Sequence, residues 1–285
     1  MRVVPTDSGA VAMHDAETGE VMHPIVGPLV EGEELYVRPA RLRERLAEDV
    51  DAPLVLFDVG LGAGTNAALA IRVSEGRPVD PGRPSRRLHV VSFERAFEAF
   101  DLARSDEHAD AFGFDAATRD AATIVRRDGR YVSARTTWEL VAGELPGTLA
   151  STGLAANVVF WDPWSPKSNP DLWNVTTFSA LAEVCADDVT VHTYSGATAM
   201  RAAMLLAGFA VGTGGLVSFD PDASALRTKS ERTTVAARDP SRLEHPLGPR
   251  WLGTLRRSTV PFTVDVIDRE AALAAIASRA QFRDA

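Results

Sequence analysis

Glycines occupy alternate positions behind an acidic residue in the stretch Asp58 to Asn66, which reads D-V-G-L-G-A-G-T-N. The apolar run 53–57 ahead of it predicts a buried parallel strand, and the glycines would let the backbone of the following turn approach a ligand closely. The usual dinucleotide fingerprint is spaced G-x-G-x-x-G and holds a pyrophosphate. Here the spacing is G-x-G-x-G, and the carboxylate would repel pyrophosphate but attract a nucleoside with positive charge. By itself the turn is compatible with a dinucleotide, with such a cationic nucleoside, or with no ligand.

A second chemical candidate is the sequence Asp162-Pro163-Trp164, which follows the largely apolar run 157–161. A carboxylate and a neighbouring backbone carbonyl can accept the protons of a neutral amine and aim its lone pair at an electrophile. The proline would stiffen the turn, and the indole offers a flat surface for a planar group. Asp162 is therefore a candidate for orienting an amine or serving as its general base. The alternative is an aspartate that caps a helix or a turn ahead of prolines.

Two further carboxylates stand where strands are expected to end. Glu94 closes the predicted strand 88–94, and an acid at the end of the second strand of such folds accepts hydrogen bonds from the ribose hydroxyls. Glu144 follows the predicted strand 136–141 and could accept a hydrogen bond from an adenine amino group. The alternative for Glu94 is a solvated carboxylate at a strand end.

Apolar runs and helical stretches alternate along most of the chain, which is typical of a doubly wound α/β fold with a mostly parallel sheet. In such sheets ligands bind outside the carboxyl ends of the strands. We expect the strands before the glycine turn and before Asp162 to be neighbours, so that both motifs face one crevice. The predicted strands are 53–57, 88–94, 136–141, 157–161, 189–194, near 210–217 and 232–237, and the predicted helices are 66–73, 96–103, 175–185, 197–207 and 269–280.

The chain is expected to divide into three segments: an N-terminal extension on the substrate side (1–50), a nucleoside-binding domain (51–238) and a C-terminal extension (239–285). In the first, residues 1–21 suggest an entry segment or a short hairpin, with a turn at 18–20, and Met22–Val37 is too rich in proline and glycine for a helix. The last segment could serve as a lid or as a dimerisation arm. The oligomeric state does not follow from the sequence.

With 285 residues, of which 45% are hydrophobic and 24% charged, the chain has the composition of an ordinary globular protein rather than a disordered one. A net charge of −9 argues against broad nucleic-acid affinity, although arginines within 38–45, 126–130 and 250–257 could form a local phosphate-binding face. One cysteine excludes a disulfide framework and Cys-rich zinc sites. No stretch approaches the roughly 20 apolar residues that cross a membrane. We therefore expect a cytoplasmic protein without a metal site.

The glycine turn resembles motif I of class I methyltransferases, which bind S-adenosyl-L-methionine (SAM) in a Rossmann-like fold. Further segments, in the same order, resemble the methyltransferase domain family that makes 5-methylaminomethyl-2-thiouridine at the tRNA wobble position. They are Gly27–Val37, Asp58–Asn66, Asp162–Trp173, Thr193-Tyr194-Ser195 and Met200–Phe209. Residues 214–216 and 229–232 match the family's last motif only loosely, and the acidic balance is unexpected for a tRNA-binding protein.

The resemblance implies SAM as methyl donor, S-adenosyl-L-homocysteine as product, and an aminomethyl group on a tRNA uridine as acceptor. It also implies a stand-alone methyltransferase without flavin, metal or the oxidoreductase half of the fused enzymes. The expected cofactor-binding residues are Asp58, Gly60, Gly62, Gly64, Asn66, Glu94, Glu144 and Asp162. The expected catalytic residues are Asp162, Pro163 and Trp164, and the expected substrate-binding residues are Tyr36, Lys167, Asn169, Trp173, Tyr194 and Arg201.

Three other functions remain open at this point. The methyl acceptor could be the amine of a small molecule or a peptide, for which an acidic surface is no obstacle. The chain could be a noncatalytic module that binds SAM or another nucleoside. It could also be an aminopropyl transferase, because that class has a similar fold and glycine turn but uses decarboxylated SAM.

Overall fold

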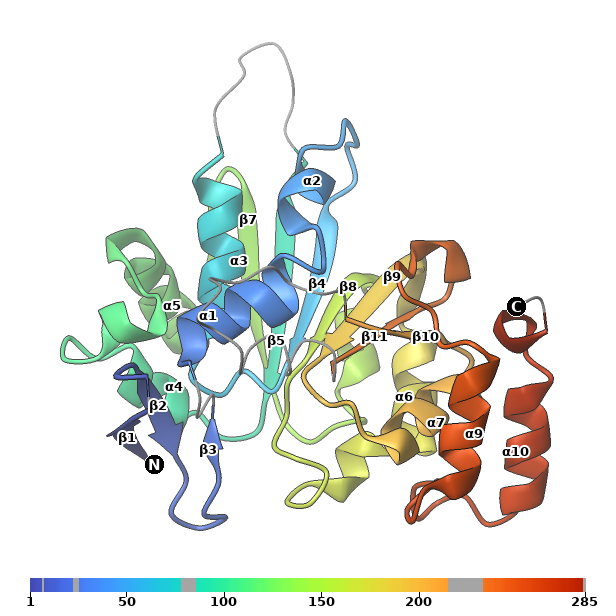
Figure 1. Cartoon of the computed structure of the whole chain (residues 1–285). Coiled ribbons are helices and arrows are strands. Elements are labelled where there is room, and N and C mark those ends of the chain that lie inside the picture. Colours follow the sequence, from blue (N-terminus) through green and yellow to red (C-terminus); the bar gives the residue numbers. More distant parts are fainter. Residues whose placement is uncertain (7, 23–25, 78–85, 215–232, 284–285) are drawn as a thin grey trace. The chain divides into compact units, whose positions relative to one another are not determined.

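The computed structural model describes residues 1–6, 8–22, 26–77, 86–214 and 233–283 (Figure 1). The chain forms two compact units. Unit 1 contains Met1–Glu144 and Val158–Pro163, and unit 2 contains Leu145–Asn157 and Trp164–Ala285. These units do not follow the three segments expected from the sequence, and that functional division stays a prediction.

The sheet of unit 1 is mostly parallel, as predicted. Its strands lie in the order β8-β4-β5-β7-β6, and only the edge strand β6 runs antiparallel to its neighbour. β4 is buried at every position, which suits a central parallel strand covered on both faces. Asp58 of β4 lies opposite Phe160 of β8, so the predicted neighbours do pair. The bounds are β4 Leu54–Val59, β5 Leu88–Glu94, β6 Arg130–Val132, β7 Thr136–Ala142 and β8 Ala156–Trp161.

Local capping marks both ends of helix α5 in unit 1. Asp115 caps α5 by accepting a hydrogen bond from the Thr118 backbone N–H at 2.9 Å, and Gly129 ends that helix with a φ of 76°. α3 begins directly after the glycine turn, as predicted. The bounds are α1 Pro28–Gly32, η1 Glu33–Val37, α2 Leu42–Leu46, α3 Thr65–Glu75, α4 Glu98–Ala103, η2 Ala109–Phe112 and α5 Ala116–Asp128.

The prediction that Met22–Val37 is too rich in proline and glycine for a helix is wrong, because α1 and the π-helix η1 lie within this segment. Pro28 stands in the first turn of α1, where a missing N–H breaks no hydrogen bond of the helix. Gly32 has a helical φ of −59° and serves close packing: an added Cβ would lie 2.6 Å from Cδ1 of Leu69 in α3. Both helix breakers are therefore compatible with the helix in its tertiary setting.

The N-terminal residues form a separate antiparallel meander in unit 1, in agreement with the predicted hairpin. β1 (Arg2–Pro5) pairs with β2 (Val11–His14), which pairs with β3 (Val21–Met22). The Asp15 side chain accepts hydrogen bonds from the Glu17 backbone and the Thr18 hydroxyl, which stabilises the predicted turn.

Unit 2 contains three antiparallel strands in the order β10-β11-β9 and four α-helices within its described part. β9 begins at Cys185, which therefore lies in a strand rather than at the end of the predicted helix. The helix α9 was not anticipated, and the predicted strand ends at 215–217 and 232 lie outside the described residues. The bounds are η3 Leu149–Thr152, η4 Pro170–Trp173, α6 Val175–Glu183, β9 Cys185–Thr193, α7 Thr198–Leu206, β10 Ala210–Thr213, β11 Thr234–Ala237, η5 Pro240–Arg242, α9 Pro249–Arg257, α10 Arg269–Ala277 and η6 Ala280–Phe282.

Candidate active site

The carboxylate of Asp162 lies just beyond the carboxyl end of β8 and is held from two sides. The Tyr36 hydroxyl donates to Oδ1 at 2.6 Å, and Nδ2 of Asn66 donates to Oδ2 at 2.8 Å. The Asp162 backbone N–H donates to the Val59 carbonyl at 2.9 Å, which continues the pairing with β4. The donors to this carboxylate therefore come from two different elements, η1 and α3.

The π-helix η1 positions the Tyr36 hydroxyl. The backbone N–H of Arg38 donates to the carbonyl of Glu33 at 2.9 Å, five residues back. The Tyr36 ring is 1% exposed and packs against Phe160 of β8, with ring centroids 5.4 Å apart. Isolated π-helical turns are rare and are frequent at functional sites. Here the turn belongs to the element that supplies the Tyr36 hydroxyl as a donor to Asp162.

The glycine turn and the Asp162-Pro163 segment are in direct contact. Gly60 has a φ of 81°, and a Cβ added there would lie 2.7 Å from Cα of Pro163 and 2.8 Å from the Asp162 carbonyl oxygen. No side chain fits in that space. The two motifs therefore meet at one edge of the sheet, as the sequence predicted, and Gly60 is required for their approach.

A buried chain of hydrogen bonds crosses three neighbouring strands below the turn. Trp138 Nε1 of β7 donates to Ser92 Oγ of β5 at 2.9 Å, and Ser92 Oγ donates to Asp58 Oδ2 of β4 at 2.7 Å. Oδ1 of Asp58 is buried and has no hydrogen-bond partner among the residues that the structure describes. Sequence analysis missed Ser92 and Trp138, because nothing in their local pattern distinguishes them from ordinary core residues.

The charge of Asp58 is destabilised by its surroundings. Burial raises the pKa of its carboxyl to about 7; the hydrogen bond from Ser92 opposes this shift, and the nearby charges of Asp162 and Glu94 add to it. A positively charged group next to Asp58 would favour the ionised carboxylate. The site therefore suits a cationic ligand better than an anionic one.

Glu94 reaches the glycine turn, whereas Glu144 is exposed. Oε2 of Glu94 accepts from the Gly62 backbone N–H at 3.0 Å, and Oε1 accepts from the Arg95 N–H at 2.8 Å. Glu144 forms an ion pair of 3.6 Å with Arg95, which itself follows Glu94. Met22 of β3 packs against the same turn. Its sulfur lies 3.4 Å from the position that a Cβ on Gly62 would take.

The other expected site residues lie in unit 2, where two of them hold the backbone in place. Trp173 is 1% exposed; its Nε1 donates to the Trp164 carbonyl at 2.8 Å, and its ring meets Tyr194 edge-on at 5.6 Å. Arg201 donates to Thr234 Oγ1 and to the Thr233 carbonyl, both at 2.9 Å, and burial lowers its pKa to about 10. Lys167 is exposed and Asn169 is half-buried. The substrate-binding role of these residues stays a prediction.

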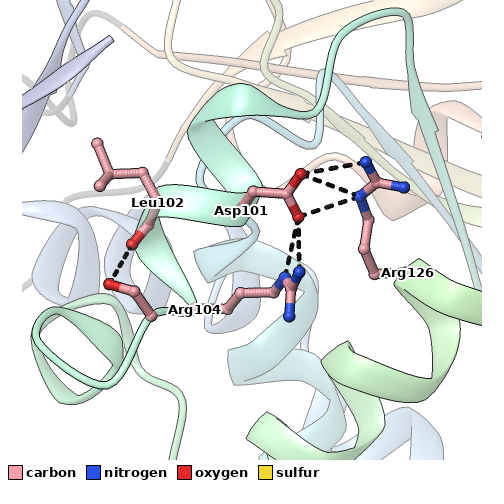
Figure 2. Close-up of polar contacts among 5 residues, drawn as sticks. Asp101, Leu102, Arg104 and Arg126 are labelled. Atoms are coloured by element: carbon pink, nitrogen blue, oxygen red, sulfur yellow. Dashed lines mark hydrogen bonds and ion pairs between the residues drawn. The ribbon is translucent and has the colours of Figure 1, made fainter.

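Arginines of the 126–130 group are paired with carboxylates. Figure 2 shows Asp101 of α4 between Arg104 and Arg126, with oxygen–nitrogen distances of 2.9–3.2 Å. The Arg126 guanidinium also lies 4.8 Å from the ring centroid of Phe97. Arg127 pairs with Asp128 and Arg130 with Glu139. Arg126 thus ties α5 to α4, and because each arginine of the group has a carboxylate partner, the group is not a free cationic face.

The described part of the chain contains neither a membrane-spanning helix nor a metal-ligand cluster. None of its helices is both long and apolar enough to span a membrane. Within the same residues, no cluster of three or more His, Cys, Asp or Glu side chains could hold a metal ion.

Comparison with known proteins identifies relatives of this chain. The S-adenosyl-L-methionine-dependent methyltransferase family matches residues 118–217. The tRNA 5-methylaminomethyl-2-thiouridine biosynthesis bifunctional protein MnmC of Burkholderia vietnamiensis is 29% identical over 205 residues, which cover 68% of this chain and 30% of that protein. The Burkholderia mallei protein of the same name is 27% identical over 208 residues, with coverage of 67% and 30%. The chain thus spans about a third of the length of these relatives.

A solved structure has the same fold. The crystal structure of MNMC2 from Aquifex aeolicus superimposes with a TM-score of 0.70 at 22% identity, covering 96% of this chain and 82% of that one. At this level of identity the likeness concerns the fold. Together, the family match over residues 118–217, the aligned relatives and the shared fold make the chain similar to S-adenosyl-L-methionine-dependent methyltransferases and to part of the bifunctional MnmC proteins.

Proposed function

We propose that this protein transfers a methyl group from SAM to the aminomethyl amine of a tRNA wobble uridine, converting 5-aminomethyl-2-thiouridine to 5-methylaminomethyl-2-thiouridine. The observation that carries the proposal is the Asp162 carboxylate, fixed by Tyr36 and Asn66 and in contact with the glycine turn. This arrangement places an oriented hydrogen-bond acceptor beside a turn suited to a nucleoside.

The residues around the turn fit SAM, which supplies an electrophilic methyl group on a positively charged sulfur. Asp58 would balance the positive charge, and Glu94 would accept hydrogen bonds from the ribose hydroxyls in place of the Gly62 N–H. Glu144 would accept one from the adenine amino group. Gly60, Gly62 and Gly64 all have positive φ and keep the turn free of side chains.

Asp162 would act on the acceptor rather than on the donor. A primary amine attacks through its lone pair only when it is neutral, and an acceptor on its N–H side aims that lone pair. As the new C–N bond forms and the C–S bond breaks, the bonding electrons leave with sulfur and the nitrogen becomes positive. Asp162 would stabilise that charge, and the surplus proton then leaves to the carboxylate or to water.

The tRNA acceptor is supported by the relatives, whose names place them in tRNA 5-methylaminomethyl-2-thiouridine biosynthesis. Trp164, Lys167, Asn169, Trp173, Tyr194 and Arg201 are the proposed substrate-side residues, and Pro163 would hold the turn that orients Asp162. A cytoplasmic location is consistent with this acceptor. Neither flavin nor metal is required for the transfer itself.

The test uses methyl-labelled SAM and tRNA that carries 5-aminomethyl-2-thiouridine. Label should enter the modified nucleoside with wild-type protein, and Asp162→Asn should abolish the transfer while calorimetry shows SAM affinity changed little. Label in a small amine or a peptide but not in RNA would reassign the acceptor. Binding of SAM without turnover on any amine would identify a noncatalytic module, and turnover of decarboxylated SAM in its place would identify an aminopropyl transferase.

A further inference from the structure

Helix α9 of unit 2 has one face anchored in the core of that unit. Trp251 stacks on Phe282 of η6 with ring centroids 6.2 Å apart and an interplanar angle of 13°, and Leu255 is fully buried. Figure 1 shows α9 and α10 beside α7. Because the apolar side of α9 packs into unit 2, this packing fixes which residues of α9 lie on the opposite side.

The opposite side is basic. Arg250, Gly253 and Arg257 recur at helical spacing and share one face, and Arg256 lies beside Gly253. All three arginines are exposed, and none of them forms an ion pair with a carboxylate among the residues that the structure describes. We call Arg250, Gly253, Arg256 and Arg257 the α9 basic face.

The other two arginine groups of the sequence differ in this respect. Arg38 pairs with Glu34 and Arg43 with Glu33, and Arg45 is 6% exposed. Arg41 is left as a single exposed arginine of that group without an ion pair among the described residues. The 126–130 group is paired throughout, as described above. In a chain with a net charge of −9, the α9 basic face is therefore an uncompensated cluster of positive charge.

Two residues of this face oppose helix formation. Arg250 stands in the first turn, where the positive end of the helix dipole disfavours a cation. Gly253 stands in the helix interior, where glycine is less favourable than alanine. Its φ is not positive, and an added Cβ would meet only the guanidinium of Arg257 at 3.2 Å, the movable end of a side chain. The fold therefore explains neither residue.

We propose that the α9 basic face binds the sugar-phosphate backbone of the RNA substrate, an inference that rests on the tRNA acceptor proposed above. Arginine matches the geometry of phosphate oxygens with two parallel N–H donors. Glycine between the arginines lets a phosphate group approach the helix backbone closely. Arg250 and Arg257 lie about 10 Å apart along the axis, so they reach different phosphates.

An RNA strand suits this face better than a membrane does. A membrane-binding helix inserts an apolar side, and the apolar side of α9 is buried against Phe282 and the rest of unit 2. Contacts to phosphates would carry no sequence information; they would fix the position of the RNA while other residues select the base. The C-terminal extension would thus serve as a tRNA-positioning element.

Charge removal tests the proposal directly. Binding of a fluorescein-labelled tRNA transcript to the full chain is measured by anisotropy at several salt concentrations. The double variant Arg250→Gln/Arg257→Gln should bind roughly tenfold more weakly, with a salt slope smaller by about 2. The control Arg269→Gln/Arg283→Gln removes two exposed arginines of the same unit and should bind like wild type. Equal loss in both, no loss in either, or no binding by wild type would overturn the proposal.

Glycine substitution separates binding from folding. Gly253→Ala and Gly253→Gln should both raise Tm by about 2 °C, because both residues favour the helix over glycine. They should nevertheless weaken tRNA binding several-fold, glutamine more than alanine. Unchanged tRNA binding in the stabilised variants would refute the close approach. Selective loss of binding to vesicles of anionic lipid, with tRNA binding intact, would instead make the face a membrane contact.

The test of the α9 basic face and the test of the methyl acceptor can fail independently of each other. If the proposed function is right and this inference wrong, the arginine variants methylate tRNA with an unchanged KM. If the inference is right and the function wrong, wild type binds tRNA through α9 but transfers no label to it. If both hold, KM for tRNA rises in the arginine double variant while kcat at saturating tRNA stays the same.

Discussion

The Tyr36 hydroxyl donates a 2.6 Å hydrogen bond to Oδ1 of Asp162, although the two residues are 126 positions apart in sequence. Asn66 binds the other oxygen of the same carboxylate, so the carboxylate is oriented from two sides. An amine that reaches Asp162 meets an acceptor already held in place, which reduces the entropy lost in attaining the reactive geometry.

Replacing Tyr36 with phenylalanine should lower the rate of methyl transfer without unfolding the protein. The ring would still pack against Phe160, while Asp162 would lose the hydrogen bond from the Tyr36 hydroxyl. We expect kcat to fall roughly tenfold, the effect of one hydrogen bond to a charged group. Single-turnover transfer from labelled SAM measures the rate, and calorimetry should show an unchanged Kd for SAM. Tyr131→Phe in β6 is the matched control, and an equal fall in that variant would contradict the assignment.

Gly60→Ala should be far more damaging than the same change at another glycine with a similar backbone. The new Cβ would lie 2.7 Å from Cα of Pro163 at a φ of 81°, and about 3 kcal/mol of stability should be lost together with methyl transfer. Gly129 has a φ of 76° and nothing within 4 Å of an added Cβ. Gly129→Ala should therefore lose only about 1 kcal/mol and keep full activity. Urea unfolding and transfer assays on both variants decide whether the contact with Pro163 matters.

The raised pKa of Asp58 should make the stability of the SAM-free protein depend on pH. Its carboxyl has a pKa of about 7 when folded, against an ordinary aspartate pKa of 3.8, so the folded state binds the extra proton between these values. Stability should therefore fall as pH rises from 4 to 7, by up to about 4 kcal/mol, and stay level above 7. Asp58→Asn lacks this pH dependence, so the stability of the variant relative to wild type should rise from pH 4 to pH 7. Thermal unfolding at a series of pH values measures it, and a constant difference would refute the shift.

Binding of SAM should reduce the free-energy cost of ionising Asp58. A cation next to Asp58 lowers the pKa of the carboxyl, so wild type should release a proton on binding below pH 7 and bind more tightly as pH rises from 6 to 8. Calorimetry in two buffers of different ionisation enthalpy measures the proton. Asp58→Asn should bind more weakly at pH 8 and release no proton. A wild-type affinity that falls with pH would show that Asp58 does not face the positive charge.

Ser92→Ala should destabilise the ionised form of the Asp58 carboxyl. It removes the donor to Asp58 Oδ2 and leaves Trp138 Nε1 without its acceptor in the core. A loss of about 1–3 kcal/mol is expected, together with a higher pKa for Asp58 and weaker SAM binding at pH 7. Ser105→Ala is a suitable comparison, because that half-buried hydroxyl donates to the Leu102 carbonyl at 2.8 Å and has no contact with Asp58 among the described residues. Equal effects of the two changes would remove Ser92 from the cofactor site.

Much of the framework follows from local pattern. The apolar run before Asp58 and the run before Asp162 predict buried strands, and the rules of parallel sheets place their carboxyl ends together. The glycine spacing predicts a turn close to another chain segment or ligand. These features depend on neighbouring residues and on a general topology, so a single sequence is enough to find them.

The errors have a tertiary cause. Gly32 and Pro28 indicate a break in a helix, yet both lie in α1. Glycine is needed at position 32 because Leu69 leaves no room for a side chain. Likewise, α9 was missed because proline and glycine at its start and centre conceal an amphipathic helix whose Trp251 packs against Phe282. Only the packing partner distinguishes such residues from ordinary helix breakers.

The α/β framework, the glycine turn and the place of Asp162 at a strand end can be predicted from the amino-acid sequence, because hydrophobic period and turn chemistry are local. The contacts of Asp162 depend on the folded chain, since Tyr36 and Asn66 reach it from 126 and 96 positions away. The same holds for the Trp138–Ser92–Asp58 chain, which depends on the strand order. Hydrogen bonds between distant residues follow from how the chain is folded, and a linear pattern carries no record of them.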